Sequence, residues 1–498
     1  MRCVLIIPAW APEEIFPART AGSQINYWQP LGTLYVGACL LRAGHEVTFL
    51  DGSFLSHEAI LQRVRQLKPD FAGIYSTTFG WPSALRTAQD IKALDPGIWT
   101  CVGGPYPTAA PEACLDDGGR AIDAVVVGEG ERTVVEILER LESGRDLAGV
   151  AGLIARKDGR IVRNPPRPLI ADLDALPYPS RELLGDRSRY IPAPATYRRK
   201  PVAIVTTSRG CDRHCLFCFQ MDKERKSGTH GVRYRSIENV LEEIELCLRQ
   251  GYREIKFIDD SLAADRDRAM RLTAEIRRRG LDFTWFASVC ANQGDEELFR
   301  AMKAGGCWAV LIGGESGVQR NLNTIRKGAT LDQIRGAVAA AKAAGLRVTV
   351  PFMFGIPGET FDDALATIDF AVSLNPDLAN FHAITPFPGT PLHDRAAEYG
   401  TVSRNLRDFT FQGAAFAPHS MTRDEILKAR QLAFRRFYSR PSFLLRRLAA
   451  IRSLEDCRTA ITGARSLFWL WVDRTLFRHK RPTPRQSPAE PRANRGTH

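Results

Sequence analysis

Long hydrophobic runs are absent from this sequence. No run of about 18 apolar residues occurs among its 498 residues, so no membrane-spanning helix is expected. The first residues, MRCVLIIPAWAP, contain one basic residue and a very short apolar run, which indicates a strand and not a signal peptide. The chain is long enough for two or three domains with substantial cores. These absences favour a globular protein of the cytoplasm.

A secreted disulfide framework is also missing. The chain has eleven cysteines and only three of them cluster, which fits a reducing compartment. A broad excess of charge is missing as well, because most of the net charge of +12 comes from residues 440–498, where thirteen Arg and Lys residues stand against four acids. The rest of the chain is close to neutral, so no nucleic-acid partner is expected.

The three clustered cysteines have the spacing C-x3-C-x2-C and directly follow the extended run Val202–Thr207. A [4Fe–4S] cluster normally takes four thiolates, so the triad Cys211, Cys215 and Cys218 suggests three ligands and one open iron. The spacing alone leaves a zinc site, or three unrelated buried cysteines, as alternatives. Zinc signatures usually show a second Cys/His pair about 12–20 residues further on, and no such pair follows here.

The first 150 residues alternate strand and helix patterns. This alternation predicts an α/β domain with a doubly wound, Rossmann-like parallel sheet, whose ligands bind beyond the carboxyl ends of the strands. No G-x-G-x-x-G follows the first strand, which weakens a dinucleotide interpretation. The expected strands are Arg2–Ile7, Glu46–Asp51, Asp70–Ser76, Ile98–Val102 and Ile122–Val127, and the expected helices are Leu31–Ala43, Ser56–Gln66, Trp81–Leu94 and Thr133–Leu141.

Residues 151–195 are rich in proline and are expected to form an ordered connecting segment. From residue 196 to residue 400 a strand is followed by a helix six times, which predicts a partial (β/α)6 barrel of the TIM type, open at one side. Catalytic groups of such barrels lie at the carboxyl ends of the strands. The expected strands are Val202–Thr207, Glu254–Ile258, Phe283–Ser288, Ala309–Gly313, Arg347–Met353 and Leu378–Ile384, with helices at Ile237–Arg249, Asp265–Arg278, Glu296–Ala304, Leu331–Ala344 and Phe361–Leu374.

Residues at the other strand ends of the barrel also suggest a ligand site. Asp259 and Asp260 end the second strand, Ser288 ends the third, and Glu315 follows the fourth. Carboxylates there can bind an ammonium group and ribose hydroxyls through charge-assisted hydrogen bonds. Taken singly, each acid also fits a solvated loop or a helix N-cap. Together with the triad at one rim, these residues favour the ligand site.

Several stretches resemble the cobalamin-binding radical S-adenosylmethionine (SAM) enzymes, a family that includes cobalamin-dependent methyltransferases and anaerobic magnesium-protoporphyrin ester cyclases. The resemblance covers about residues 1–440 and is carried by PLG at residue 30, AGHEVTFLDG, VGGPYPT, VVVGEGERT, the cysteine triad, IGGESG and GIPGE. It implies a [4Fe–4S] cluster on the triad, with SAM bound to the open iron. The SAM-binding residues that it implies are Phe217 and the turn Gly355, Ile356 and Pro357 at adenine, Asp259 and Asp260 at the methionine ammonium, Glu315 at ribose, and Ser288.

The same resemblance implies that the first domain binds cobalamin. The D-x-H-x-x-G motif of enzymes that ligate cobalt with histidine is absent, and His57 has the wrong spacing, so no protein imidazole is expected on the lower face of the corrin ring. The implied cobalamin-binding residues are Pro30, Leu31, Gly32, Thr77, Thr78, Gly103, Gly104, Pro105, Gly128, Glu129, Gly130 and Glu131.

The family chemistry would act on an unactivated carbon of a small molecule. One hypothesis is C-methylation of a lipid, a tetrapyrrole or a secondary-metabolite intermediate. A second is a radical cyclisation or rearrangement without methyl transfer, and a third is a cobalamin- or redox-sensing protein without turnover. An electron donor such as flavodoxin or ferredoxin is the protein partner that the resemblance implies. No single residue is assigned as catalytic.

The chain after residue 400 departs from the barrel pattern. Residues 401–481 are expected to be a helical region, which includes a helix at 422–438 and a basic, aromatic helix near 465–481. Tryptophan and phenylalanine beside arginine suit a helix lying on anionic lipid, and a helix packed on the barrel is the alternative. Residues 482–498 are expected to be disordered.

Overall fold

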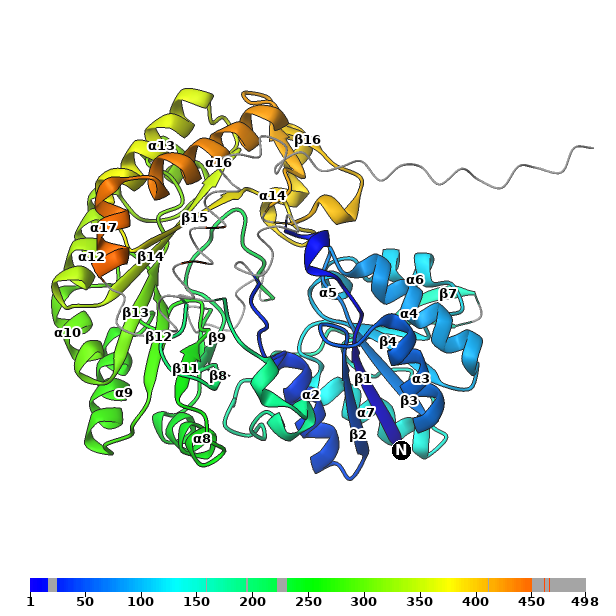
Figure 1. Ribbon diagram of the computed structural model, residues 1–498. Helices are drawn as coiled ribbons and strands as arrows, with labels where there is room; N and C mark the ends of the chain where they lie inside the picture. The colour runs from blue at the N-terminus through cyan, green and yellow to red at the C-terminus, as the bar shows by residue number, and fades with distance from the viewer. Residues whose placement is uncertain are drawn as a thin grey trace, which may run out of the picture.

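The computed structural model describes residues 1–16, 25–157, 159–193, 196–221, 231–410 and 412–449, together with residues 461 and 465. Within these ranges the chain forms two α/β domains that lie side by side, the first in blue and cyan and the barrel in green to orange (Figure 1). Most of the expected basic helix near 465–481, and the expected disordered tail at 482–498, lie outside the described residues.

The first domain is built on a sheet with the strand order β2-β1-β3-β4-β5-β6-β7. Strands β1 to β5 are parallel and have helices between them, which confirms the predicted Rossmann-like fold. The strands are β1 (Arg2–Ile7), β2 (Glu46–Asp51), β3 (Phe71–Tyr75), β4 (Trp99–Gly103) and β5 (Ala124–Val126), and the helices are α2 (Leu31–Arg42), α3 (His57–Leu67), α4 (Trp81–Leu94), α5 (Pro105–Ala109), α6 (Pro111–Gly118) and α7 (Gly130–Glu142).

The sheet continues into the segment that was expected to connect the domains. Strands β6 (Leu153–Lys157) and β7 (Arg160–Arg163) add to its edge as an antiparallel hairpin. Gly159 in the hairpin loop has φ +77°, a conformation that suits glycine in such tight turns. Further along the segment, Ile170, Leu173 and Leu176 are buried against α2.

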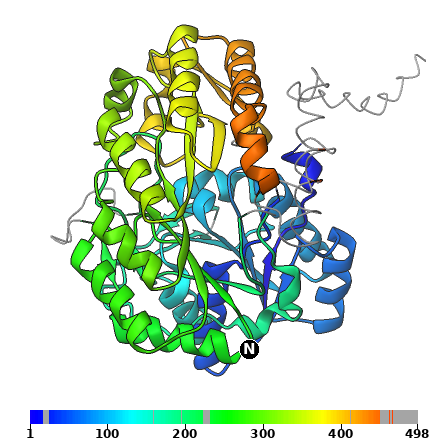
Figure 2. The same cartoon turned by 60° about the vertical axis from the view of Figure 1, so that its left-hand side comes forward.

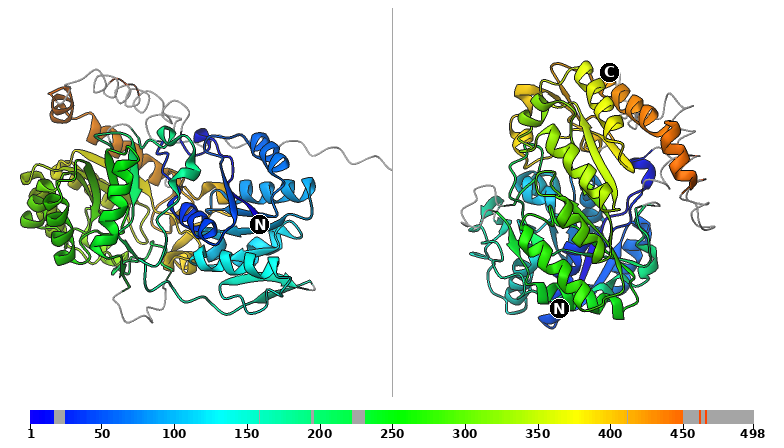
Figure 3. Two further views of the ribbon diagram at one scale, coloured as in Figure 1. Left: turned by 90° about the horizontal axis from the view of Figure 1, so that it is seen from below. Right: turned by 90° about the vertical axis from the view of Figure 1, so that its left-hand side faces the viewer.

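The second domain is a six-stranded parallel sheet with the order β15-β14-β13-β12-β11-β8. Consecutive strands are neighbours and helices cover the outside, so the predicted partial (β/α)6 barrel is confirmed (Figure 3). The strands are β8 (Val202–Val205), β11 (Glu254–Phe257), β12 (Thr284–Val289), β13 (Cys307–Ile312), β14 (Arg347–Phe354) and β15 (Leu378–Ala383), with α8 (Ile237–Arg249), α9 (Arg266–Arg278), α10 (Glu296–Ala304), α11 (Gln319–Thr324), α12 (Leu331–Ala343) and α13 (Phe361–Leu374).

The open edge of the barrel at β8 is covered by the segment that precedes α2. The Gln29 side chain donates to the carbonyl of Val202 at 3.4 Å and accepts from the amide of Ile204 at 3.3 Å, as a neighbouring strand would. Arg181 donates to the Ile204 carbonyl at 2.6 Å and pairs with buried Glu243 at 2.5 Å. An unpaired strand edge leaves backbone groups unsatisfied, and these side chains satisfy those of β8.

The chain after β15 returns to the barrel. It forms α14 (Pro391–Asp394), α15 (Ala396–Tyr399), the strand pair β16 (Gly400–Val402) and β17 (Phe416–Pro418), α16 (Arg423–Tyr438) and α17 (Pro441–Ala449). Helix α16, orange in Figure 2, packs against β15 and α13, and Phe437 is buried there. None of the described helices has the length and apolar character needed to cross a membrane.

Candidate active site

A cavity of about 500 Å³ lies where the carboxyl ends of the two sheets face each other. This volume is in the range of small-molecule and cofactor sites. From the first domain it is lined by Leu31, Gly32, Gly103, Gly104, Pro105, Gly128, Glu129, Gly130 and Glu131, all of which the resemblance implies for cobalamin. Pro30, Thr77 and Thr78 are not among its lining residues, and the Thr77 hydroxyl accepts a hydrogen bond from the Gly80 amide at the start of α4.

Glycines keep the first-domain wall of the cavity flat. At Gly32 and Gly128 nothing lies within 4 Å of the position where a Cβ would stand, so any larger side chain there would project into open space. Gly104 has φ +109°, and a Cβ there would meet the Tyr75 ring at 2.9 Å. This wall therefore fits a large, flat ligand such as a corrin ring.

The two carboxylates of the glycine turn are neutralised by the second domain. Arg209 bonds Glu129 at 2.8 Å and Glu131 at 2.7 Å, and Arg233 bonds Glu129 at 2.9 Å. Burial acts to raise the pKa of Glu129, but the hydrogen bonds from Arg233 and Arg209 outweigh it and leave this pKa lowered. Glu129 and Glu131 thus join the two domains beside the cavity, a role that the sequence patterns did not predict.

The cysteine triad lies on the loop that follows β8 and the short strand β9 (Ser208–Arg209). Cys211 is half-buried and lines the cavity, Cys215 is buried and Cys218 is exposed. A hydrogen bond with the Cys218 thiol lowers the pKa of Cys215, and nearby Lys327 acts in the same direction. Three soft thiol donors on one short loop fit the ligand set of an iron–sulfur cluster with one open iron.

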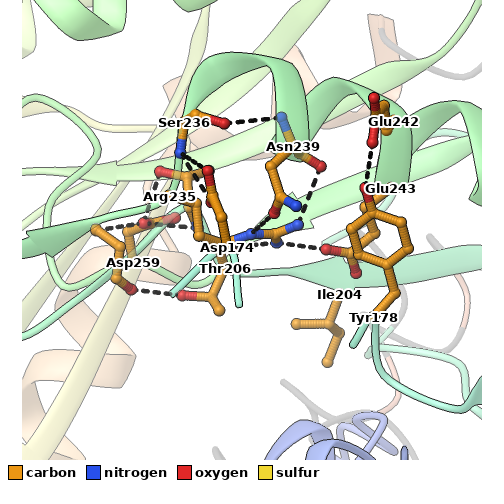
Figure 4. A network of polar contacts seen from close by, with 12 residues as sticks. Asp174, Tyr178, Ile204, Thr206, Arg235, Ser236, Asn239, Glu242, Glu243 and Asp259 are labelled. Carbon is orange, nitrogen blue, oxygen red and sulfur yellow. Dashed lines mark hydrogen bonds and ion pairs between the residues drawn. The ribbon is translucent and has the colours of Figure 1, made fainter. Parts of the chain in front are cut away.

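The backbone that leads into this loop is fixed by a polar network around the end of β8 (Figure 4). Arg235 donates to the Thr206 carbonyl at 2.8 Å and pairs with buried Glu243. Arg268 donates to the Thr207 hydroxyl at 3.0 Å, and the Asp259 carboxylate accepts from the Thr207 amide at 3.0 Å. These contacts satisfy the backbone groups at the base of the cysteine loop and define its position.

Asp259 and Asp260 point in opposite directions although they are adjacent. Ile255 and Phe257 pack into the core beneath the helices, and Asp259 follows them on that side, where it also accepts from the Thr207 hydroxyl at 2.9 Å. Asp260 lies on the opposite side with Ile258 and lines the cavity. Burial, followed by the nearby Asp259, raises the pKa of Asp260 to about 6. Only Asp260 is placed to meet a ligand in the cavity.

Glu315 follows β13 and forms a buried ion pair with Lys327 at 2.6 Å. Glu315 has φ +60°, and its backbone bonds β14 through Pro351 and Met353, which fixes its position. Lys327, which the sequence patterns did not single out, lies close enough to Cys215 to act on the pKa of that thiol. A cation, a carboxylate and a thiol thus meet on one side of the cysteine loop.

The turn Gly355–Pro357 is held from within by Glu359. Its carboxylate accepts from the amides of Gly355 at 2.5 Å and Ile356 at 3.0 Å. Glu359 is fully buried, and burial raises its pKa to about 8. The glutamate of GIPGE thus shapes the turn and is not available to a ligand.

The last two predicted SAM-binding residues, Phe217 and Ser288, are partly buried. Phe217 packs against the barrel core, and Ser288 lies on the interior side of β12, where it is partly exposed.

Two sequence families match the chain. The Radical SAM superfamily matches residues 205–371, and the B12 binding domain matches residues 22–138. An uncharacterized methyltransferase of Pyrococcus horikoshii is 35% identical over 452 residues, which cover 90% of this chain and 94% of the relative. The anaerobic magnesium-protoporphyrin IX monomethyl ester cyclase of Rubrivivax gelatinosus is 29% identical and covers 85% of this chain and 76% of its own length.

Solved structures have the same architecture. The radical S-adenosylmethionine methyltransferase TsrM of Kitasatospora setae, solved with cobalamin and a [4Fe–4S] cluster, aligns with a TM-score of 0.64 over 93% of this chain and 98% of its own. At 19% identity this likeness concerns the fold.

The chain belongs to the radical SAM superfamily, in the branch that carries a B12-binding domain. It is an enzyme of the cobalamin-dependent radical SAM methyltransferase family, to which cyclase-like relatives also belong. The cofactors of this family are a [4Fe–4S] cluster, SAM and cobalamin, in agreement with the sequence prediction. The alternatives of a zinc protein and of a sensor without turnover have no support from these relatives.

Proposed function

We propose that this enzyme methylates an unactivated carbon of a small molecule in the cavity between its two domains. The observation that carries the proposal is that residues of both predicted cofactor sites line one cavity. Gly32, Gly103 and Gly128 line it from the B12-binding domain, and Cys211 and Asp260 line it from the barrel. A methyl group carried on the first side and a radical formed on the second would meet within this cavity.

The triad Cys211, Cys215 and Cys218 would bind the cluster in this proposal. Asp260 would accept the methionine ammonium of SAM, and Glu315 would accept the ribose hydroxyls. The backbone of Gly355, Ile356 and Pro357, shaped by Glu359, would contact adenine, with Phe217 and Ser288 nearby. The cobalamin wall would be formed by lining residues of the cavity, namely Leu31, Gly32, Gly103, Gly104, Pro105, Gly128 and Gly130. Glu129 and Glu131 would fix its turn through Arg209, and Pro30, Thr77 and Thr78 do not line the cavity.

When bound, these cofactors supply reductive cleavage of SAM to a carbon radical and a methyl group for transfer. The chain's own residues supply position and protection. The Arg235, Arg268 and Asp259 contacts hold the cysteine loop in place, and Lys327 balances negative charge beside Cys215. In the connecting segment, Ile170 and Leu173 pack against Leu31, which itself lines the cavity.

A second candidate function is radical cyclisation without methyl transfer, which the 29% identity to a magnesium-protoporphyrin ester cyclase favours. The 35% identity to a methyltransferase, over nearly the full length of both chains, favours methylation. We propose a cytoplasmic enzyme whose electrons come from a flavodoxin or ferredoxin. A lipid or tetrapyrrole substrate, and contact of the C-terminal helix with a membrane surface, remain predictions of the sequence.

The experiment that tests this proposal is anaerobic reconstitution with iron, sulfide and cobalamin, followed by incubation with methyl-labelled SAM and a cell extract. Label in a product supports methylation, whereas 5′-deoxyadenosine with an unlabelled product supports the second candidate. Cys215→Ala removes a cluster ligand and should abolish 5′-deoxyadenosine formation. The matched control is Cys114→Ala, a buried cysteine of α6 that should keep its iron and its activity. A Cys215→Ala enzyme that still cleaves SAM would contradict the cluster assignment.

A further inference from the structure

Lys256 is a buried lysine in the interior of the barrel that forms no ion pair with a carboxylate of the described residues. It lies on β11 on the same side as Ile258, with 2% of its surface exposed. Its ammonium lies 5.1 Å from the centre of the Trp28 ring and 4.8 Å from that of Phe286. Among the described residues no acidic side chain is within ion-pair distance of it.

The nearest acid is Glu254, one step deeper on the same strand, and its oxygens are used elsewhere. They accept from the amides of Arg198 and Arg199 at 2.7 Å, from the Thr284 hydroxyl at 2.9 Å and from the Trp308 indole at 3.2 Å. The hydrogen bonds of Glu254 thus go to other groups, and the electrostatic attraction between Glu254 and Lys256 does not offset the burial of the lysine. A buried ammonium with this environment costs free energy unless an anion joins it.

Packed side chains do not completely fill the interior of the barrel around Lys256. Along β12, β14 and β15 the residues that face the helices are fully buried, whereas alternate residues on the interior side are partly exposed. Interior positions of a closed barrel are filled by packed side chains. The partly exposed interior positions are Thr284, Phe286, Ser288, Thr349, Pro351, Asn380 and His382.

We propose that Lys256 binds an anionic group of the substrate, a carboxylate or a phosphate, inside the barrel. This assignment rests on the proposed function and narrows it to substrates that carry an acid group. Trp28 and Phe286 flank the ammonium and form apolar walls for the part of the substrate next to that group. A neutral lipid would leave the charge unpaired and is disfavoured.

The depth of Lys256 separates it from the SAM carboxylate, the other anion of the site. It lies four residues before Asp260, which lines the cavity together with Cys211, so the chain separates the two positions by at most about 13 Å. The methionine end of SAM has to reach the cysteine loop, where Lys327 already provides a cation. An anion at Lys256 therefore belongs to a second molecule.

The ammonium of Lys256 loses its proton at a lower pH than that of an ordinary lysine. Burial lowers the pKa of Lys256 to about 8, against the weaker raising effect of Glu254. The neighbouring strands and the segment before α2 present Ile204, Thr284, Phe286, Ser288 and Trp28, none of which titrates. An anion should bind while the ammonium is charged and should be released as the pH rises through about 8.

The test uses the reconstituted enzyme and an extract divided by anion exchange into an anionic and a neutral pool. With methyl-labelled SAM, label should appear in the anionic pool. Lys256→Met should raise the half-saturating concentration of that pool about ten- to hundredfold, the loss expected for a charged hydrogen bond, and Lys256→Arg should retain part of the affinity. Lys303→Met is the matched control and should behave as wild type, because this lysine is exposed and donates to the Gly345 carbonyl at 2.9 Å.

Label that enters only the neutral pool would overturn the anion site and leave methyl transfer intact. Weaker SAM binding by Lys256→Met without extract would assign the lysine to the SAM carboxylate and would also overturn it. If wild type labels neither pool, methyl transfer fails, and thermal unfolding then decides the anion site alone. Inorganic phosphate or acetate at constant ionic strength should raise the Tm of wild type more than that of Lys256→Met, and an equal rise would contradict the proposal.

Discussion

Two adjacent acids at the rim show what the sequence pattern predicts about a site and what it does not predict. The sequence marks Asp259 and Asp260 as a pair at a strand end, which is correct. Successive side chains of a strand point to opposite faces, and this fact assigns Asp259 to the helix side and Asp260 to the cavity. The sequence pattern alone does not tell whether Asp259 or Asp260 faces the ligand. That assignment requires the positions of the strands on both sides of β11.

This division gives Asp259 and Asp260 different mutational effects. Asp259→Ala removes the acceptor of the Thr207 amide, the Thr207 hydroxyl and the Ser208 hydroxyl, and should lower the free energy of unfolding by about 2–4 kcal/mol. Asp260→Ala should change stability little and should weaken SAM binding. Urea unfolding and equilibrium SAM binding measure the two effects. Equal losses of stability in both variants would contradict the assignment.

Asp260 should also give SAM binding a pH dependence. Its pKa is raised to about 6, so the carboxylate is ionised above that pH and neutral below it. Affinity for the methionine ammonium should therefore fall as the pH drops through about 6. Asp260→Asn should bind SAM weakly with no such transition. A wild-type affinity that stays constant across this range would show that Asp260 does not contact the ammonium.

At the scale of elements, regular strand and helix patterns predict most of the architecture. The six strands of the barrel and the five parallel strands of the first sheet lie within a few residues of their expected positions. The sequence did not predict the hairpin β6–β7, because residues 151–195 were assigned together as one connecting segment on account of the prolines that begin at Pro165. The Asp-Gly pair at 158–159 is nevertheless typical of hairpin loops. The sequence did not predict the role of Glu359, because that role depends on the turn at Gly355 folding back onto the Glu359 carboxylate.

Glu359 should make stability depend on pH. Its folded-state pKa is raised to about 8, whereas a glutamate in the unfolded chain ionises near its ordinary value. Between these values the folded protein retains a proton that the unfolded chain has lost, so stability falls with rising pH, by at most about 1.4 kcal/mol per unit. The Glu359→Gln variant has no ionisable group at this position, so its stability lacks this contribution to the pH dependence. Its stability relative to wild type, measured by urea unfolding, should therefore improve from about pH 6 to about pH 8, and a constant difference would contradict the argument.

At the scale of the whole molecule, the contacts that join the domains could not be predicted from the sequence. Gln29 bonds the backbone of Ile204 across a separation of 175 residues, and Arg209 reaches Glu129 across 80. Local patterns contain no information on such pairs. The sequence predicts two cofactor domains, and only the fold shows that residues predicted for both cofactors line one cavity.

The Arg209 ion pairs should hold the cobalamin side of the cavity in place. Arg209→Gln leaves buried Glu131 without its cation and should lower the free energy of unfolding by about 3 kcal/mol and reduce the cobalamin retained on gel filtration. Arg266 also pairs with two acids, Asp295 and Glu297, but on an exposed surface. Arg266→Gln is therefore the matched control and should have little effect. Equal cobalamin retention in the two variants would contradict this role.

The most direct test of the account is the balance of products from the fully reconstituted enzyme with methyl-labelled SAM and its substrate pool. Cobalamin-dependent radical methylation predicts 5′-deoxyadenosine, S-adenosylhomocysteine and labelled product in equal amounts, all of them dependent on the cysteine triad, and transfer of label dependent on cobalamin. 5′-Deoxyadenosine formed without S-adenosylhomocysteine or label, or methyl transfer that persists without cobalamin, would contradict the account.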